Sequence, residues 1–168
     1  MGVPGQNRTA EGLERKHREG GFTLIEVMVV CAIIGIASVI AIPNYLEWKA
    51  QHDLREAVTE FAGNLNLARI VAMNRNRQAT VTILVNGSGQ IDVTGTAAGA
   101  PIFSTQTMSG SVTGLGVPSP TNVSFSSMGL STAAGPQVIP IVNTRGVTYS
   151  VSVTPSGKVT WCPKATCP

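Results

Sequence analysis

Charged residues are scarce in this sequence. Asp, Glu, Lys and Arg make up 12% of its 168 residues, about half of the roughly 25% found in typical domains. Beyond Gln78 the chain has one carboxylate, Asp92, and no histidine. Because acid–base and metal-dependent catalysis need positioned acids, bases or metal ligands, the sequence predicts that the protein is not an enzyme and holds no cofactor or metal.

A strong excess of one sign of charge is also missing. The formal net charge is +3, which does not require a nucleic-acid partner. The region after Gln78 combines low net charge with many Val and Ile residues, a composition that is not typical of disorder. We therefore expect β-structure in a domain of residues 79–168, which is rich in Gly, Ser and Thr.

One long apolar run does occur, from Phe22 to Ile42, and it contains a single charge, at Glu26. A helix of about 21 residues rises roughly 30 Å, which is enough to cross the hydrocarbon core of a bilayer. Basic residues are more frequent before the run than just after it: Arg8, Arg15, Lys16 and Arg18 precede it, and Lys49 and Arg55 follow it. This asymmetry predicts that residues 1–21 stay in the cytoplasm and that the C-terminal domain is exported.

The small residues that could mark a cleavage site, Gly20 and Gly21, lie before the apolar run. An ordinary secretory signal is cut after its apolar core, so a cut after Gly21 would instead keep the helix of residues 22–42 in the mature protein. Val39-Ile40-Ala41 is the alternative, conventional site. Cleavage there would remove the helix.

Glu26 needs an explanation of its own, because a carboxylate at the centre of a membrane helix costs about 2.5 to 3.5 kcal/mol, and less near an end. Cleavage after Gly21 would create a positive amine on Phe22, about one helical turn away from Glu26. The amine of a neighbouring subunit is a second candidate partner. Solvation at the helix start, where the macrodipole favours a negative charge, is the third explanation.

Residues Gly21 to Val27, GFTLIEV, resemble the type III signal of type IV prepilins and type II secretion pseudopilins. The resemblance implies cleavage after Gly21 by a prepilin peptidase, N-methylation of Phe22, and assembly with other pilins or pseudopilins into a helical filament. It also implies a single-pass protein of the bacterial inner membrane, with its C-terminal domain in the periplasm before it enters the filament.

The helix is expected to continue as an amphipathic segment over residues 43–78 and to extend from Phe22 to about Asn76. Pro43 predicts a kink, because proline removes one helical hydrogen bond. Apolar residues then recur at spacings of three and four, which indicates one buried face: Leu54, Val58, Phe61, Ala62, Leu65, Ala68 and Ala72.

The sequence also makes predictions for four other residues of this segment. Gly63 should cost about 1 kcal/mol relative to Ala and permit close packing against the sheet. Arg69, Arg75 and Arg77 lie near the expected C-terminus of the helix, where the dipole favours cations. We favour this interpretation of the three arginines over phosphate binding.

The remaining sequence predicts strands. Ala79 to Val85 and Gln90 to Thr94 form an expected hairpin across the turn of residues 86–89. Further strands are expected at Pro101 to Thr105, Ser111 to Thr113, Asn122 to Ser127, Gln137 to Val142, Val147 to Val153 and Lys158 to Cys162. The predicted fold class is therefore α+β, with a long N-terminal helix packed on a C-terminal antiparallel β domain. The junction from Leu67 to Ile83 is similar to that of H-type pseudopilins (GspH) and FimT-like minor pilins, which implies a pilin-like fold.

Two cysteines, Cys162 and Cys167, lie close together in the exported part of the chain, where disulfides persist. Half of a metal site is the competing interpretation, but the chain has no second Cys or His pair to complete four ligands. A disulfide is therefore favoured.

Three functions follow from these features. The first is a structural minor pilin or pseudopilin, in either a type IV pilus or a type II secretion system. The second is DNA binding for DNA uptake, which the family resemblance suggests and for which Arg145, Lys158, Trp161 and Lys164 are the candidate residues. The third is adhesion through the Ser/Thr/Gly-rich loops.

Overall fold

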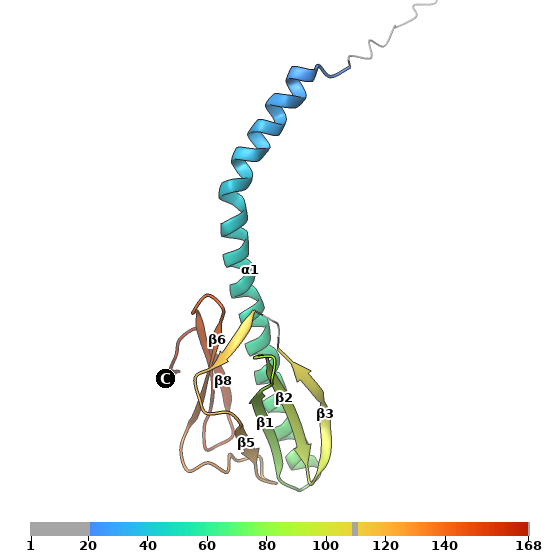
Figure 1. Ribbon diagram of the computed structural model, residues 1–168. Coiled ribbons are helices and arrows are strands. Elements are labelled where there is room, and N and C mark those ends of the chain that lie inside the picture. The colour runs from blue at the N-terminus through green and yellow to red at the C-terminus, as the bar shows by residue number, and fades with distance from the viewer. Residues whose placement is uncertain (1–20, 109–110, 168) are drawn as a thin grey trace, which may run out of the picture. The chain divides into compact units, whose positions relative to one another are not determined.

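The computed structural model describes residues 21–108 and 111–167 (Figure 1). Residues 1–20 lie outside this range, so the expected leader, apart from Gly21, and its basic residues have no structural account. One helix precedes eight strands in the described part of the chain. The helix passes through two compact units, whose boundary falls between Ile40 and Ala41.

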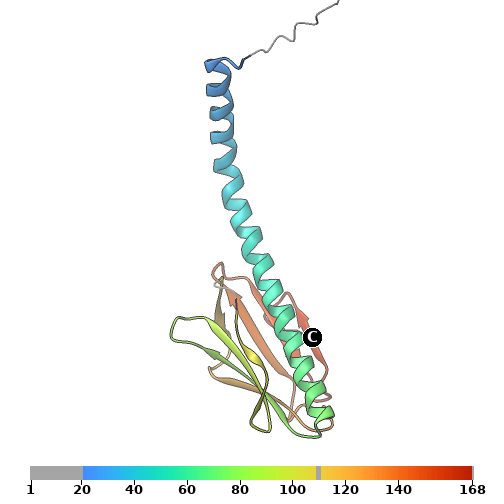
Figure 2. The same cartoon turned by 90° about the vertical axis from the view of Figure 1, so that its right-hand side faces the viewer.

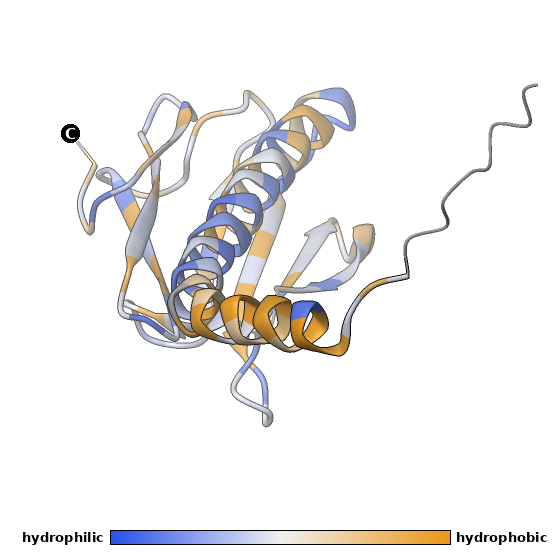
Figure 3. Ribbon diagram, turned by 90° about the horizontal axis from the view of Figure 1, so that it is seen from above, coloured by the Kyte–Doolittle hydropathy of each residue, from blue (hydrophilic) through white to orange (hydrophobic). Residues whose placement is uncertain are grey.

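The helix α1 spans Leu24–Asn74 and has 51 residues, which confirms the expected range to within two residues at each end. Large apolar side chains of its first part are open to solvent, from Val30 at 49% to Leu24 at 78% exposed, and Figure 3 shows this part almost entirely in the colour of hydrophobic residues. Within the described residues, no single helix satisfies the length and hydropathy of a membrane span. Leu24–Val39 and Ala41–Asn74 satisfy them only together, as a bent pair. Pro43 lies inside α1, and the kink expected there stays a prediction.

The second part of α1 packs on the β domain through the predicted face. All seven apolar residues of the predicted face, from Leu54 to Ala72, are at most 7% exposed. The close packing expected at Gly63 is wrong: this residue is exposed, and a Cβ built on it would meet nothing within 4 Å. The physical reason is helical geometry, because Gly63 lies two positions, about 200° around the axis, from the buried residues Phe61 and Leu65.

The strands form two antiparallel sheets. The first sheet has the order β3-β2-β1-β5 and consists of β1 (Ala79–Val85), β2 (Ile91–Ala97), β3 (Ala100–Thr107) and β5 (Thr121–Phe125). The second has the order β4-β6-β7-β8 and consists of β4 (Val112–Leu115), β6 (Gln137–Asn143), β7 (Thr148–Val153) and β8 (Val159–Cys162). Both sheets share one core with the second part of α1, whose residues pack with Phe125, Ile139 and Val151. Figure 2 shows this part of the helix running alongside the strands. The predicted α+β class is thus confirmed.

Individual strands differ from the predictions mainly at their ends. The hairpin of β1 and β2 is confirmed, although β2 extends to Ala97. The strand expected to run to Ser127 ends at Phe125, because Ser126 accepts a hydrogen bond from the Gly129 amide at 2.8 Å and opens a turn. Gly129 has a φ of +75° in this turn, a conformation that glycine adopts without steric cost.

Candidate functional site

The expected cleavage site lies just outside the helix. Gly21, Phe22 and Thr23 precede the first helical residue, Leu24, and Phe22 is 81% exposed. Proteases act preferentially on exposed segments without regular structure. The Gly21–Phe22 bond is therefore placed where an enzyme can reach it.

Thr23 caps the start of α1. Its side-chain oxygen accepts a hydrogen bond from the Glu26 amide at 3.3 Å, and its carbonyl oxygen accepts from the amides of Glu26 and Val27 at 3.1 and 3.3 Å. Glu26 falls in the first turn of the helix, where the dipole stabilises a negative charge. We missed this cap from the sequence, although the pattern Thr-x-x-Glu before an apolar run is a known signal for a helix N-terminus.

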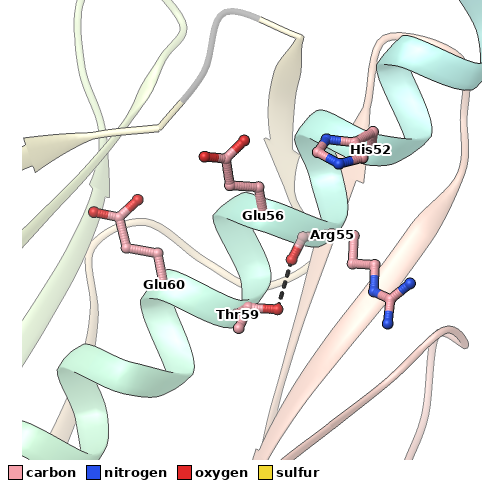
Figure 4. Close-up of a pocket in the computed structure, with 5 residues that line it drawn as sticks. All are labelled: His52, Arg55, Glu56, Thr59 and Glu60. Atoms are coloured by element: carbon pink, nitrogen blue, oxygen red, sulfur yellow. Dashed lines mark hydrogen bonds between the residues drawn. The ribbon is translucent and has the colours of Figure 1, made fainter.

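A second group of polar side chains lies on the second part of α1 (Figure 4). His52, Arg55, Glu56, Thr59 and Glu60 line a shallow hollow on the exposed surface of the helix. The Thr59 hydroxyl donates to the carbonyl oxygen of Arg55 at 2.8 Å, so it is hydrogen-bonded within the helix and not to a general base. This geometry supports a solvated helix face.

His52 and Glu56, together with Asp53, place potential metal-ligand atoms within 4.8 Å of one another. Asp53 is already engaged, because its Oδ2 lies 3.1 Å from the Lys49 ammonium and 3.2 Å from the Ser111 hydroxyl. His52 and Glu56 are exposed. Solvated groups of this kind are common on helices and do not define a metal centre.

Both tryptophans and both tyrosines of the chain take part in ring contacts at or near α1. On the helix, the Trp48 ring lies 6.2 Å from Tyr45 and 5.5 Å from His52. On the second sheet, Trp161 stacks on Tyr149 at 6.0 Å, and the Arg55 guanidinium lies 5.7 Å from the Trp161 ring. The ring of Trp161, one of the DNA candidates, therefore already contacts Tyr149 and Arg55 of this chain.

The other DNA candidates do not form one patch. Arg145 lies in the turn between β6 and β7, and Lys158 follows the turn at the other end of β7. The six residues of β7 separate these turns by about 20 Å at 3.3 Å per residue. Lys164 lies beyond β8, inside the loop that the disulfide closes.

The predicted disulfide is confirmed. Cys162 and Cys167 are bonded, with their Cα atoms 5.7 Å apart. The Ser150 hydroxyl donates to the carbonyl oxygen of Ala165 at 2.7 Å and ties the loop to β7. The remaining cysteine, Cys31, is free and exposed on the apolar part of α1.

Sequence reasoning gave Arg69 the wrong role. Its Nε donates to the carbonyl oxygen of Gly129 at 2.9 Å, and its Nη2 lies 3.4 Å from the carbonyl oxygen of Ser156. The last turn of α1 contains no basic residue, so Arg69 lies before the helix end and binds two turns of the β domain. We found no signal in the sequence for these long-range contacts.

Comparison with known proteins gives two family matches. Residues 16–42 match the prokaryotic N-terminal methylation motif, and residues 57–157 match the family described as type II transport protein GspH. Residues in the first match include Phe22, Glu26 and the bond after Gly21 where cleavage is expected. The second match covers most of the β domain and most of the part of α1 that packs on it.

Several relatives match parts of the chain. Type II secretion system core protein G of Aeromonas hydrophila is 36% identical over 66 residues, which are 39% of this chain and 46% of the relative. Type IV major pilin protein PilA of Myxococcus xanthus is 55% identical over 42 residues, or 25% of this chain and 19% of that one. Fimbrial protein EcpC of Eikenella corrodens is 34% identical over 99 residues, or 55% and 65%. The chain thus spans less than two thirds of each of these relatives.

Two solved structures share the fold. The type IV minor pilin FimU of Pseudomonas aeruginosa aligns with 72% of this chain and 96% of its own, with a TM-score of 0.53 and 16% identity. The minor pseudopilin EpsH of Vibrio cholerae aligns with 66% of this chain and 97% of its own, with a TM-score of 0.50 and 16% identity. At this level of identity the likeness shows a common fold and nothing more.

Proposed function

The chain belongs to the family of type II transport proteins GspH and carries the prokaryotic N-terminal methylation motif, and on this premise we propose that it is a structural minor subunit of a type IV pilus or type II secretion filament. The observation that carries the proposal is α1. One continuous helix of 51 residues presents exposed apolar side chains in its first part and packs on a β domain with its second part. The first part of such a helix can pass from a bilayer into the apolar interior of a filament, because its side chains are apolar and so are both environments.

Processing is the first step of the proposed function. A prepilin peptidase hydrolyses the Gly21–Phe22 bond and frees the amine of Phe22, which then accepts a methyl group from a methyl donor in a separate step. The exposed position of this bond ahead of the first helical residue supports the cut. The helix, which begins at Leu24, stays intact in the product.

Glu26 then serves as the assembly residue. The carboxylate lies in the first turn of α1, and Phe22 and Glu26 border the same small hollow on its surface. A positive amine on Phe22, from the same chain or from a neighbour, neutralises this charge in an apolar environment. Pairing between subunits would set the register of the helices in the filament.

The family is anchored in the membrane through its N-terminal helix. For this chain we propose a single pass through the inner membrane, with the N-terminus in the cytoplasm and the β domain in the periplasm. The excess of basic residues before the apolar run supports this orientation. DNA capture is not proposed as a second function, because Lys158 lies at the opposite end of β7 from Arg145 and Trp161 is stacked within the domain.

The test is the substitution Glu26→Ala, with Arg145→Ala as the control, since Arg145 is an exposed charged residue of the β domain outside the motif. The Glu26→Ala chain should be cut by the peptidase yet enter filaments at least about tenfold less than the native chain, which corresponds to about 1.4 kcal/mol. Arg145→Ala should enter normally. Equal entry of all three chains into filaments would rule out the assembly role of Glu26. Absence of the native chain from filaments would rule out the proposed function.

A further inference from the structure

Five large apolar side chains lie exposed around the C-terminal end of α1, which we call the helix-end patch. Its members and their exposed fractions are Leu67 (41%), Ile70 (49%), Met73 (41%), Met128 (73%) and Leu130 (42%). The three helix residues follow one another at intervals of three and share one face of α1. Met128 and Leu130 belong to the loop after β5.

The loop and the helix adjoin each other at Gly129. Arg69 donates to the carbonyl oxygen of Gly129 at 2.9 Å, and a Cβ built on Gly129 would meet the Met73 sulfur at 2.7 Å. The turn of residues 154–157 is bound to the same loop, because the Ser131 amide donates to the carbonyl oxygen of Pro155 at 3.0 Å. The two parts of the patch are therefore held in one place by hydrogen bonds and packing.

The border of the helix-end patch is basic. Arg75 and Arg77 follow the end of α1, Lys158 follows the adjoining turn, and all three are exposed. The sequence has no Asp or Glu between Glu60 and Asp92. Asp92 pairs with Leu84 near the far end of β1 from the helix end, so no carboxylate of the described residues balances these cations.

We propose that the helix-end patch is the docking surface for a neighbouring pilin-type subunit, which contacts it with an apolar segment bordered by carboxylates. This inference rests on the proposed filament function. Exposed apolar patches with a polar border mark protein interaction sites, and flexible methionine side chains adapt to a partner's surface. The basic border selects an acidic partner and repels a basic one.

This chain itself shows that a pilin-type subunit can carry such a segment. Near the start of the second unit, Tyr45, Leu46 and Trp48 are 46% to 61% exposed, and Glu47 lies among them. Farther along, the exposed residues Glu56 and Glu60 give this part of α1 more carboxylates than the helix end. Contacts between two unlike surfaces of similar subunits are heterologous and extend into open filaments.

The proposal is tested with full-length chains produced in cells that assemble the filament. Met128→Ser removes an apolar side chain, and Val85→Ser is its control, since Val85 is 37% exposed but lies in β1. The double variant Arg75→Glu with Arg77→Glu reverses the charge at the border of the patch. Arg145→Glu is the control for an exposed arginine elsewhere. The two patch variants should be processed normally but enter sheared filaments at least fivefold less than the native chain, whereas both controls should enter as the native chain does.

A photo-crosslinking amino acid at position 128 identifies the occupant. The expected product joins position 128 to a peptide of another subunit with a methylation motif, within a segment that contains exposed apolar residues and Asp or Glu. A second copy of this chain, joined through residues 45–60, meets that description and supports the proposal. Crosslinks to lipid, to nucleic acid or to a protein without such a segment overturn it.

The outcomes also separate the two proposals. If the native chain enters filaments and the patch variants enter equally well, the docking surface is wrong and the filament function stands. If the native chain is processed but never found in filaments, both are wrong. Melting temperatures of the Met128→Ser and Val85→Ser chains within about 2 °C of the native value would exclude unfolding as the cause of poor entry.

Discussion

The Nε of Arg69 in α1 donates to the carbonyl oxygen of Gly129 at 2.9 Å, across 60 residues of sequence. The same guanidinium reaches the carbonyl oxygen of Ser156 with Nη2, at 3.4 Å. One side chain therefore connects the helix to a turn from each sheet. The planar, multi-donor head of arginine suits this geometry, whereas lysine offers a single point charge.

We predict that Arg69→Lys lowers the free energy of unfolding by about 1 to 2 kcal/mol, because at least one of the two carbonyl groups loses a charged donor. Arg69→Ala should cost more. Urea unfolding of the full chain in detergent, followed by tryptophan fluorescence, measures the change. The control is Arg145→Ala, at an exposed turn position, which should change the free energy of unfolding by no more than about 0.5 kcal/mol. Equal free energies of unfolding for Arg69→Lys and the native chain would contradict the prediction.

Gly157 should tolerate no side chain. Its φ is +77°, and a Cβ there would overlap the carbonyl oxygen of Gly129, so both backbone strain and a steric clash oppose Gly157→Ala. We expect a loss of about 3 kcal/mol. Gly89→Ala is the matched control, because Gly89 has a φ of +75° with nothing within 4 Å of the built Cβ; it should cost only about 1 kcal/mol. Similar losses in the two variants would show that no clash exists at Gly157.

Gly63→Ala should stabilise the protein. Gly63 lies in the interior of α1, and a Cβ there meets nothing within 4 Å, so the substitution gains helix propensity without a clash. The expected gain is about 1 kcal/mol in the same urea experiment. A loss of stability would mean that the close approach at Gly63, which the structure does not show, exists after all.

Asn143 links β6 to α1, and the stability of the protein should be sensitive even to replacement of its side-chain nitrogen by oxygen. It is 3% exposed; its Oδ1 accepts from the amides of Arg145 and Val147 at 3.0 and 2.9 Å, and its Nδ2 donates to the carbonyl oxygen of Ala50 at 3.3 Å. Asn143→Ala should cost about 1 to 3 kcal/mol. Asn143→Asp should cost more at neutral pH, because it replaces the donor facing Ala50 with a buried negative charge.

The neighbouring Thr144 provides the control for this prediction. Thr144 is exposed, and its amide donates to the carbonyl oxygen of Ser111 at 2.9 Å. Because the substitution leaves that main-chain bond in place, Thr144→Ala should stay within about 0.5 kcal/mol. An Asn143→Asp chain as stable as Asn143→Ala would contradict the extra cost predicted for the buried negative charge.

The local elements were predictable from the sequence because their causes are local. The apolar spacing from Leu54 to Ala72 marks the buried face of α1, and the turn at residues 86–89 connects β1 and β2 as expected. The order of the strands was not predictable. β1 pairs with β5 as well as with β2, and nothing within either segment specifies a partner that lies about 40 residues away.

The side-chain roles divide in the same way. Thr23 could have been predicted as the cap of α1, since its pattern with Glu26 is local. Arg69 could not, because a cation near a helix end fits the dipole equally well whether or not it binds a distant turn. The basic DNA candidates were grouped by their order in the sequence, and β7 separates Arg145 from Lys158 in space.

The proposed function requires that α1 stays whole in the mature protein while the leader before it is removed. The decisive measurement is mass spectrometry of the N-terminal peptide of the chain purified from membranes or filaments. We expect a peptide that begins with N-methylated Phe22 and contains Glu26. A mature chain that begins after Ala41, with the apolar part of the helix gone, would contradict it.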